Sequence, residues 1–304
     1  MTPVSLPDEV RAACAWVAER ARSVRIEESK INEYASGLPQ TDPEDDPPPF
    51  AEDPESAAAF AICMNAINFG SGWWPTIRKR PGHSGYGTMA AGVTDRFASA
   101  GSWTVEELQA MDAATIAVVV GQDPGHPLME QFARALRDVG NHIDLEHGGR
   151  FIGPAEAADS IPTLAGTFAS WNTFADASEY DGRRIPFYKR AQLAAADLQR
   201  AGIVDLPGLD RLTAFADNHV PHVLRVDGIL RLDSALLAPI EAEELLEQGS
   251  PEEVELRACA VHALELLAVT SALAPAEIDS ALWNRGRERR YKSLARPRSR
   301  TTAY

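Results

Sequence analysis

The fold class is decided by SPEEVELRACAVHALELLAVTSAL, the stretch of sequence at residues 250–273. Its apolar residues recur at the three- and four-residue spacing of a helix. Ser250 is a good N-cap residue and Pro251 suits the first helical position. The acids at positions 252 and 253 favour the positive end of the helix dipole. The stretch therefore predicts a helix over residues 251–273.

Helical spacing also recurs along most of the chain. Thr104 and Glu107 form a capping-box pattern before TIAVVV, which its context favours as a helix. Since no alternating apolar run could anchor a large sheet, we expect a mainly α fold. It would be a single compact helical domain, or two intimate lobes, with at most a short hairpin around GGRFIG at residues 148–153. Further helices are predicted at residues 57–69, from near 86, and at 128–139, 161–174, 188–198, 209–216 and 234–246.

The chain divides into three segments. Residues 1–37 predict an N-terminal helical segment, in which Val10, Cys14 and Val17 have helical spacing and Ser5 is a candidate cap. Residues 38–55 are rich in proline and acids, which exclude both helix and central strand, and predict an exposed loop. Residues 56–304 form the remaining domain, which contains the candidate site residues.

Composition limits the classes of function. The net charge of −15 opposes a polymeric nucleic acid as partner, although a small phosphorylated substrate remains open. Cys14, Cys63 and Cys259 are odd in number, far apart and within apolar stretches. We expect buried, reduced thiols in a cytoplasmic protein. The first residues carry no secretory pattern, and no window approaches the ~20 apolar residues of a membrane helix, so no membrane partner is expected.

The first candidate site segment is FGSGWWP, followed by a basic, glycine-rich stretch. Trp73 and Trp74 lie beside Gly70 and Gly72, and glycine lets the backbone approach a bound group closely. With Tyr86 they are candidates for stacking on a flat heteroaromatic ligand. The alternative is that the paired tryptophans anchor a loop onto the core.

The second segment is FYKRAQLAAAD. It places Lys189 at a helix start and Asp197 two turns later on a similar face. A lysine is unfavourable at the positive end of a helix, so a nearby anion or acid would explain it. The alternative is a solvated lysine at the start of a helix.

The third segment is LTAFADNHVPHVLR, in which Asp217 is followed by His219 and His222. Asp217 has the residue type for acid chemistry, but it could also cap a turn before Pro221. The three side chains are of types that bind metals. Their spacing is loose and no HExxH or CxxC motif supports them, so we expect no metal and no cofactor.

At these segments the sequence resembles the queuosine salvage protein family, the queuosine 5′-phosphate N-glycosylases. The resemblance runs from about residue 55 to the end, through FGSGWW, GYGTMAAGV, IPFYKRAQLAAADL, LTAFADNHVPHVLR, GSPEEVELRACAVHALELL and LWNRGRERR. It implies a helical fold related to helix-hairpin-helix DNA glycosylases. It also implies a queuosine-salvage glycosidase domain at residues 56–304.

The resemblance implies roles for particular residues. Lys189 matches the lysine of the family's YKRAQ motif and Asp217 the aspartate of its FAD motif, so these two are the candidate catalytic residues. Glu255 and Arg257 match the family's E-V-E-I-R run, and Tyr304 matches its final tyrosine. The family continues FAD with Tyr-Arg-Val/Leu-Pro-Gln, whereas this chain has NHVPH at 218–222. The candidate substrate-binding residues are Trp73, Trp74, Tyr86, Asp197, His219, His222 and Tyr304.

The implied reaction is hydrolysis of the N-glycosidic bond of queuosine 5′-phosphate, which releases queuine base for salvage. Asp217 would stabilise the positive charge that develops on the sugar, and Lys189 would act as hydrogen-bond donor or nucleophile. Residues 78–80 (Arg-Lys-Arg) are candidates for the 5′-phosphate, or else form a solvated basic loop. The alternatives are a glycosidase for a related deazapurine nucleotide or nucleoside, a damaged-DNA glycosylase, and a non-enzymatic helical interaction module.

Overall fold

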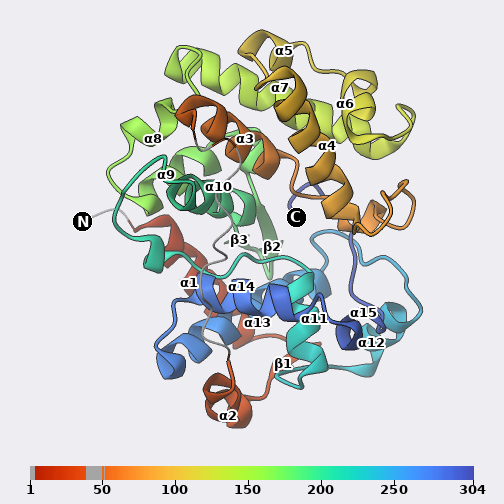
Figure 1. Ribbon diagram of the computed structural model, residues 1–304. Helices are drawn as coiled ribbons and strands as arrows, with labels where there is room; N and C mark the ends of the chain where they lie inside the picture. Colours follow the sequence, from red (N-terminus) through yellow and green to blue (C-terminus); the bar gives the residue numbers. More distant parts are fainter. Residues whose placement is uncertain (1–3, 39–49, 51) are drawn as a thin grey trace.

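Helix α13 (Pro251–Ser271) is the element around which one half of the structure packs (Figure 1). The computed structural model describes residues 4–38, 50 and 52–304, and it begins this helix at the predicted residue. The hydroxyl of Ser250 accepts a hydrogen bond of 3.3 Å from the backbone N–H of Glu253, as an N-cap does. Residues 253–261 are all buried, because other elements cover the helix on every side.

Two hydrophobic clusters stabilise the fold, which is a single compact, mainly helical domain as predicted. Tyr188 packs against both clusters, so they meet inside one domain. In Figure 1 the helices of the first cluster lie in the upper half and those of the second in the lower half. The first contains α3 (Pro54–Ala66), α4 (Gly85–Ala100), α5 (Val105–Gln109), α6 (Ala113–Val120), α7 (Pro127–His147), α8 (Gly153–Ala157), α9 (Ile161–Ala169), η3 (Asn172–Phe174) and α10 (Lys189–Arg200). The second contains α1 (Leu6–Ala18), α2 (Ile31–Ser36), α11 (His219–Val226), α12 (Ser234–Glu241), α13, α14 (Pro275–Arg285) and α15 (Arg289–Lys292).

Most predicted helices are confirmed. Helix α4 begins beside Tyr86, and TIAVVV lies in α6. The capping box is present at α5, where Thr104 and Glu107 each accept a hydrogen bond from the other's backbone N–H. The predicted loop at residues 38–55 lies mostly outside the described residues, and at its end Pro54 and Glu55 already belong to α3.

The N-terminal segment is part of the domain and contains two helices, α1 and α2, with a short strand between them that was not predicted. Helix α1 packs on α13 and buries Val10, Cys14 and Val17. Beyond it, β1 (Val24–Ile26) pairs antiparallel with β4 (Leu230–Leu232). The reason is the buried carboxylate of Glu255, which accepts hydrogen bonds from three consecutive backbone N–H groups at residues 22–24. Those groups are then unavailable to a helix.

The predicted hairpin exists, but not at GGRFIG. There Gly148, in the left-handed region at φ 59°, ends α7, and the Glu55 carboxylate binds the backbone N–H groups of residues 151 and 152. The hairpin instead joins β2 (Ala177–Tyr180) to β3 (Arg183–Pro186). Its two-residue loop is Asp181 and Gly182, both at positive φ, as this tight hairpin turn requires.

The helix predicted at residues 209–216 is wrong except for a short 3-10 turn, η4 (Leu209–Arg211). Side chains from other helices bind the backbone that follows. The N–H of Thr213 donates to the side-chain oxygen of Gln192 (3.0 Å), and the N–H of Phe215 donates to the carboxyl of Asp279 (3.0 Å). These bonds hold residues 212–216 in an irregular path that leads into Asp217.

The three cysteines are buried and free, as predicted, and burial raises the pKa of each thiol. A raised pKa keeps a thiol protonated and unreactive. Cys14, Cys63 and Cys259 therefore act as small apolar residues of the core.

Among the described residues, no single helix is both long and apolar enough to cross a bilayer. Helices α13 and α14 satisfy those criteria only when taken together, and they are bent by 109° at the break between them.

Candidate active site

Lys189 is the first residue of α10 and its side chain is buried. The preceding residue, Tyr188, has φ 51° and ψ 38°, a left-handed conformation that is strained for a tyrosine. Among the described residues, the side-chain amine of Lys189 forms no hydrogen bond and no ion pair within 4.0 Å. Burial lowers the pKa of Lys189, and the negative charges of Asp217 and Asp279 oppose that shift. A buried amine without a fixed partner is available to bind a ligand.

Asp217 ends the irregular path before α11 and is also buried. Its Oδ1 accepts hydrogen bonds from the backbone N–H groups of His219 (2.7 Å) and Val220 (3.1 Å). One oxygen therefore satisfies the start of α11, which is the capping role that the sequence left open. The other oxygen, Oδ2, accepts no hydrogen bond from the described residues. The Asp217 side chain is thus held in position through Oδ1, while Oδ2 remains available to accept a hydrogen bond.

Lys189 and Asp217 lie near each other in the fold. They are close enough for the charge of Asp217 to act on the pKa of Lys189, yet they form no direct ion pair within 4.0 Å in the part of the chain described. Each comes from a different segment, Lys189 from α10 and Asp217 from the loop before α11.

Asp279 completes this group, and the sequence analysis missed it. It lies on α14, is buried, and accepts the hydrogen bond from Phe215 described above. Burial, followed by the negative charge of Asp217, raises the pKa of Asp279 well above its usual range. This carboxyl group therefore keeps its proton at a pH where an exposed aspartate is ionised. The available signal was an acid in the apolar stretch AEIDSALW.

Arg257 joins the two sides of the site. Its guanidinium donates to both carboxylate oxygens of Asp176 (3.1 and 2.6 Å). It also donates to the backbone carbonyl of Ala216 (3.1 and 3.0 Å), the residue before Asp217. Arg257 and Asp176 are both buried, with side chains only 2% exposed. Desolvation opposes the charge on Arg257, but the negative charges of Asp176 and Glu253 outweigh it and raise its pKa.

Tyr304 lies against Arg257. Its ring centroid is 4.6 Å from the guanidinium, and its hydroxyl donates to Glu253 (2.8 Å). Glu253 is in turn 3.8 Å from Arg257. The predicted site residue Tyr304 is therefore buried in the polar network behind Asp217.

His219 and His222 have both ring nitrogens occupied. Nε2 of His219 bonds the carbonyl of Trp283 (3.1 Å), and Nε2 of His222 bonds that of Tyr291 (3.0 Å). Since a carbonyl only accepts, Nε2 carries the proton in both rings. Each Nδ1 then accepts from a guanidinium, that of Arg296 (3.1 Å) or Arg225 (3.2 Å). Burial lowers the pKa of His219, and that of His222 to about 4. Both are neutral rings that support the segment around Asp217.

No metal-binding cluster of three or more His, Cys, Asp or Glu side chains is found within residues 4–38, 50 and 52–304. The triad of Asp217, His219 and His222 is not assembled, because its imidazole nitrogens face carbonyl and guanidinium groups instead. Any metal ion would have to displace those partners.

The tryptophans of FGSGWWP pack into the first cluster. Trp73 is 9% exposed, and Trp74 lies against two glycines. A Cβ atom added at Gly85 would approach the Trp74 ring to 2.5 Å, so only glycine fits there. No direct hydrogen bond or ring stacking joins either tryptophan to Lys189 or Asp217 among the described residues. Their contacts favour the loop-anchoring alternative, and stacking on a ligand stays a prediction.

Tyr86 on α4 and Asp197, further along α10 than Lys189, form a separate group. Burial, followed by the negative charge of Asp197, raises the pKa of Tyr86 to about 12. Asp197 accepts from the side-chain amide of Asn65 (2.8 Å) and pairs with Arg200 (3.2 Å). Eight residues of helix separate Asp197 from Lys189, which is about 12 Å along the axis. A ligand that contacts both ends would have to extend along α10.

The chain segment at residues 295–304 connects these parts. The side-chain amide of Asn218 donates to the carbonyl of Pro297 (2.6 Å), and the N–H of Gly70 donates to the carbonyl of Tyr304 (3.1 Å). A Cβ atom at Gly72 would lie 2.5 Å from the carbonyl oxygen of Ser299. The glycines of FGSGWW thus permit close approach of this segment, where the sequence analysis considered a ligand. In Figure 1 the segment ends between the two halves of the molecule.

The candidate phosphate-binding residues lie on an exposed loop. Arg80 is paired with Asp95 (2.7 Å), while residues 78 and 79 are exposed to solvent. A cation that the sequence analysis did not select lies nearer the site. The negative charge of Asp217 acts on the pKa of Arg296, although burial lowers that pKa. Arg296 is therefore a buried cation near Asp217, and its Nη1 donates to Nδ1 of His219 (3.1 Å).

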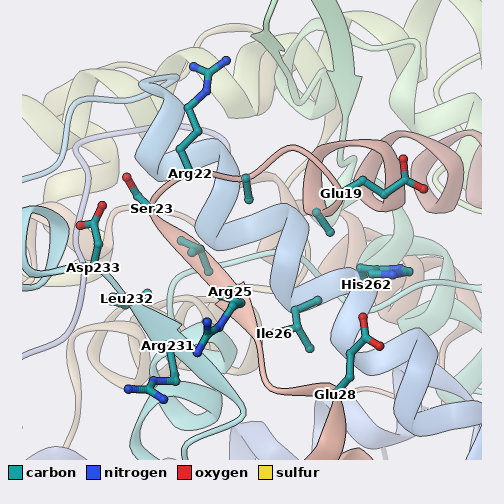
Figure 2. Close-up of a pocket in the computed structure, with 13 residues that line it drawn as sticks. Glu19, Arg22, Ser23, Arg25, Ile26, Glu28, Arg231, Leu232, Asp233 and His262 are labelled. Atoms are coloured by element: carbon teal, nitrogen blue, oxygen red, sulfur yellow. The ribbon is translucent and has the colours of Figure 1, made fainter.

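Two surface cavities lie away from this site. One, of about 490 Å³, is lined by residues of β1 and β4 and by His262, with Arg25 and Arg231 facing each other across the strands (Figure 2). The other, of about 440 Å³, surrounds Asp227 and two tyrosines. Neither contains a predicted site residue, and we place the candidate chemistry at the buried group of Lys189, Asp217 and Asp279.

Comparison with known proteins gives matches over most of the chain. A family model described as queuosine salvage protein matches residues 48–304. A protein of Sphaerobacter thermophilus is 32% identical over 270 residues, which cover 82% of each chain. One of Dictyostelium discoideum is 28% identical over 244 residues, 76% of this chain and 73% of that protein. One of Mus musculus is 31% identical over 196 residues, 58% of this chain and 57% of that protein.

All three relatives are named queuosine 5′-phosphate N-glycosylase/hydrolase. The range matched by the family model includes Lys189, Asp217 and Asp279. On the length of that match and the identity to the Sphaerobacter protein, the chain belongs to the queuosine salvage protein family.

Proposed function

We propose that this protein hydrolyses the N-glycosidic bond of queuosine 5′-phosphate and releases queuine. The observation that carries the proposal is the buried Asp217, whose Oδ1 is held by the start of α11 and whose Oδ2 accepts no hydrogen bond from the described residues. Its negative charge acts on the pKa of Lys189. The names of the relatives supply the substrate.

Cleavage of a ribosyl bond builds positive charge on C1′ and on the ring oxygen of the sugar. A carboxylate fixed beneath the sugar stabilises that charge without having to reorganise. Asp217 suits this role because two backbone hydrogen bonds fix Oδ1 and leave Oδ2 available. The same oxygen can orient the attacking water.

The departing base needs hydrogen-bond donors at positions other than N7. A 7-deazaguanine has carbon where guanine has N7, so the usual protonation site of a purine leaving group is missing. Hydrogen-bond donors must therefore act elsewhere on its ring. Asp279 retains a proton because its pKa is raised, and Lys189 supplies N–H groups, so the site offers two donors beside one acceptor.

The proposed partner is a small nucleotide. The net charge of −15 opposes a polymeric nucleic acid, since no long-range positive field would gather its phosphates. Local cations remain available, because the charge of Asp217 acts on the pKa of both Lys189 and Arg296. Hydrolysis through Asp217 requires no cofactor.

The test is incubation of the protein with queuosine 5′-phosphate and chromatographic detection of free queuine. Parallel reactions contain queuosine nucleoside, a second deazapurine nucleotide and a duplex oligonucleotide. We expect base release from queuosine 5′-phosphate and none from the duplex. Faster release from the second deazapurine nucleotide would change the substrate assignment. No release from any of them by folded protein would overturn the proposed function.

A further inference from the structure

We infer that Arg257 is a positioning residue that sets the separation between Lys189 and Asp217. The inference rests on the proposed function, because it concerns the same site. Arg257 touches neither reacting group. It acts through the backbone on which each is carried.

One arm of the network holds the start of α10. Asp176, bound by Arg257 through two hydrogen bonds, accepts the backbone N–H of Lys189 on its side-chain Oδ2 (3.3 Å). Its own backbone carbonyl accepts the N–H groups of Phe187 (2.9 Å) and Tyr188 (3.2 Å). Asp176 thus satisfies three successive N–H groups at the point where Lys189 enters the helix, including that of the strained Tyr188.

The other arm holds Asp217. The Nε and Nη2 atoms of Arg257 both donate to the carbonyl of Ala216, whose carbon is bonded directly to the nitrogen of Asp217. Hydrogen bonds therefore connect the backbone of Lys189, through the carboxylate of Asp176 and then the guanidinium of Arg257, to the backbone beside Asp217. A shift of that group would move the two residues relative to each other.

The guanidinium itself is held firmly. It lies 3.9 Å from the ring centroid of Phe187 and 4.6 Å from that of Tyr304. Glu253, which is fixed by the Tyr304 hydroxyl, provides a second negative charge. A planar group with five donors can bind two acceptors on different segments while contacting two rings. The ammonium of lysine cannot, because it is a compact point charge.

The test compares Arg257→Lys with wild type. The substitution keeps the positive charge but removes the branched guanidinium that binds Asp176 and Ala216. A change in kcat would therefore result from altered geometry and not from a lost charge. We expect kcat for queuosine 5′-phosphate to fall about 10-fold to 100-fold, because a misplacement of about 1 Å can cost that much. KM should change less than about threefold. The matched control is Glu265→Gln on the same helix, which breaks the ion pair with Arg11 (2.9 Å) and should leave kcat unchanged.

A second readout does not depend on turnover. The pH dependence of acylation of the Lys189 amine, followed by mass spectrometry, reports the environment of that amine. Its midpoint should shift in Arg257→Lys and stay at the wild-type value in Glu265→Gln. If wild type releases no base but the midpoint shifts, the proposed function fails while the positioning role stands. An unchanged midpoint, or an unchanged kcat in an active enzyme, would overturn the inference.

If Arg257→Lys does not fold, Tyr304→Phe takes its place. The ring remains over the guanidinium, and only the bond to Glu253 is lost. We expect a smaller fall in kcat with KM unchanged. Wild-type kcat and an unchanged Lys189 midpoint in this variant would overturn the inference.

Discussion

Asp217 caps the helix that begins with His219, through a hydrogen bond of 2.7 Å from the backbone N–H of His219 to Oδ1 of Asp217. The residue assigned to the chemistry is therefore also a structural residue. A loss of activity on its replacement can arise from either role. Oδ1 accepts the hydrogen bonds that cap α11, whereas Oδ2 is the oxygen proposed to act on the substrate. Substitutions that keep the cap but remove the charge can therefore separate the two roles.

Asp217→Asn should leave the protein folded and remove most turnover. The amide oxygen can still accept from the start of α11, since Asn caps about as well as Asp, but the negative charge is lost. Removal of one well-placed electrostatic stabiliser commonly lowers kcat by ~10²–10³. Melting temperature and base release should be measured together.

Asp217→Ala is the comparison for that experiment. It loses both charge and cap, so it should lose a further ~1 kcal/mol of stability relative to Asp217→Asn at similar residual activity. Near-normal base release by folded Asp217→Asn would remove Asp217 from the mechanism.

Asp279→Asn should change how stability depends on pH. The folded-state pKa of Asp279 is raised, so the native state holds a proton that the unfolded chain releases above its ordinary pKa of about 3.9. The free energy of unfolding contributed by Asp279 is therefore fully present below that pH and is lost as pH rises through the folded pKa. The amide does not titrate and keeps an acceptor for the N–H of Phe215.

The variant should accordingly gain stability relative to wild type as pH increases from 4 to 8, and show no such gain at pH 3. Urea unfolding across this range measures the difference. If the difference in free energy of unfolding between Asp279→Asn and wild type does not depend on pH, Asp279 is not held in its protonated form.

Chelation should not remove activity. Both ring nitrogens of His219 and His222 are engaged with protein groups, so neither histidine offers a lone pair to a metal ion. We expect base release to be the same after dialysis against EDTA as before it. Loss of activity that one added metal restores would contradict this and make the two histidines the leading ligand candidates.

A chain that begins at residue 48 should be unstable, although it contains the whole family match. It lacks α1, which buries Val10, Cys14 and Val17 against the second cluster and packs on α13. We expect a lower melting temperature or no cooperative unfolding. Adding a peptide of residues 4–36 in excess should raise the melting temperature, because binding to the native state stabilises it.

The control is the same peptide with Val10 and Val17 replaced by aspartate, which should have no effect. A shortened chain as stable as the full one would show that the N-terminal segment is dispensable for folding.

The sequence was sufficient to predict an element where neighbouring residues, such as a helix cap or a turn pair, determine its structure. The helix at residues 251–271 begins where its cap and proline require, and Lys189 and Asp217 come from segments whose composition the core does not demand. The hairpin at 177–186 was also predictable, since its Asp181–Gly182 pair is a strong turn signal that the analysis passed over.

What could not be predicted depends on contacts far apart in the chain. Strand β1 pairs with a strand more than 200 residues later. The carboxyl of Asp279 binds the N–H of Phe215, and Arg257 binds Asp176 and the carbonyl of Ala216. None of these contacts leaves a periodic pattern in the sequence. The segments that carry Lys189 and Asp217 could be predicted, but the side chains that hold those segments in place could not.

The segment at residues 295–304 also affects when the site is held in place during synthesis. It bonds Asn218 through Pro297, His219 through Arg296 and Glu253 through Tyr304. The ribosome makes these residues after Lys189, Asp217 and Asp279, and a chain folds progressively from its N-terminus as it emerges. A nascent chain therefore carries the reacting groups before it carries the residues that hold them in place, and it should gain activity only after Tyr304 has left the ribosome.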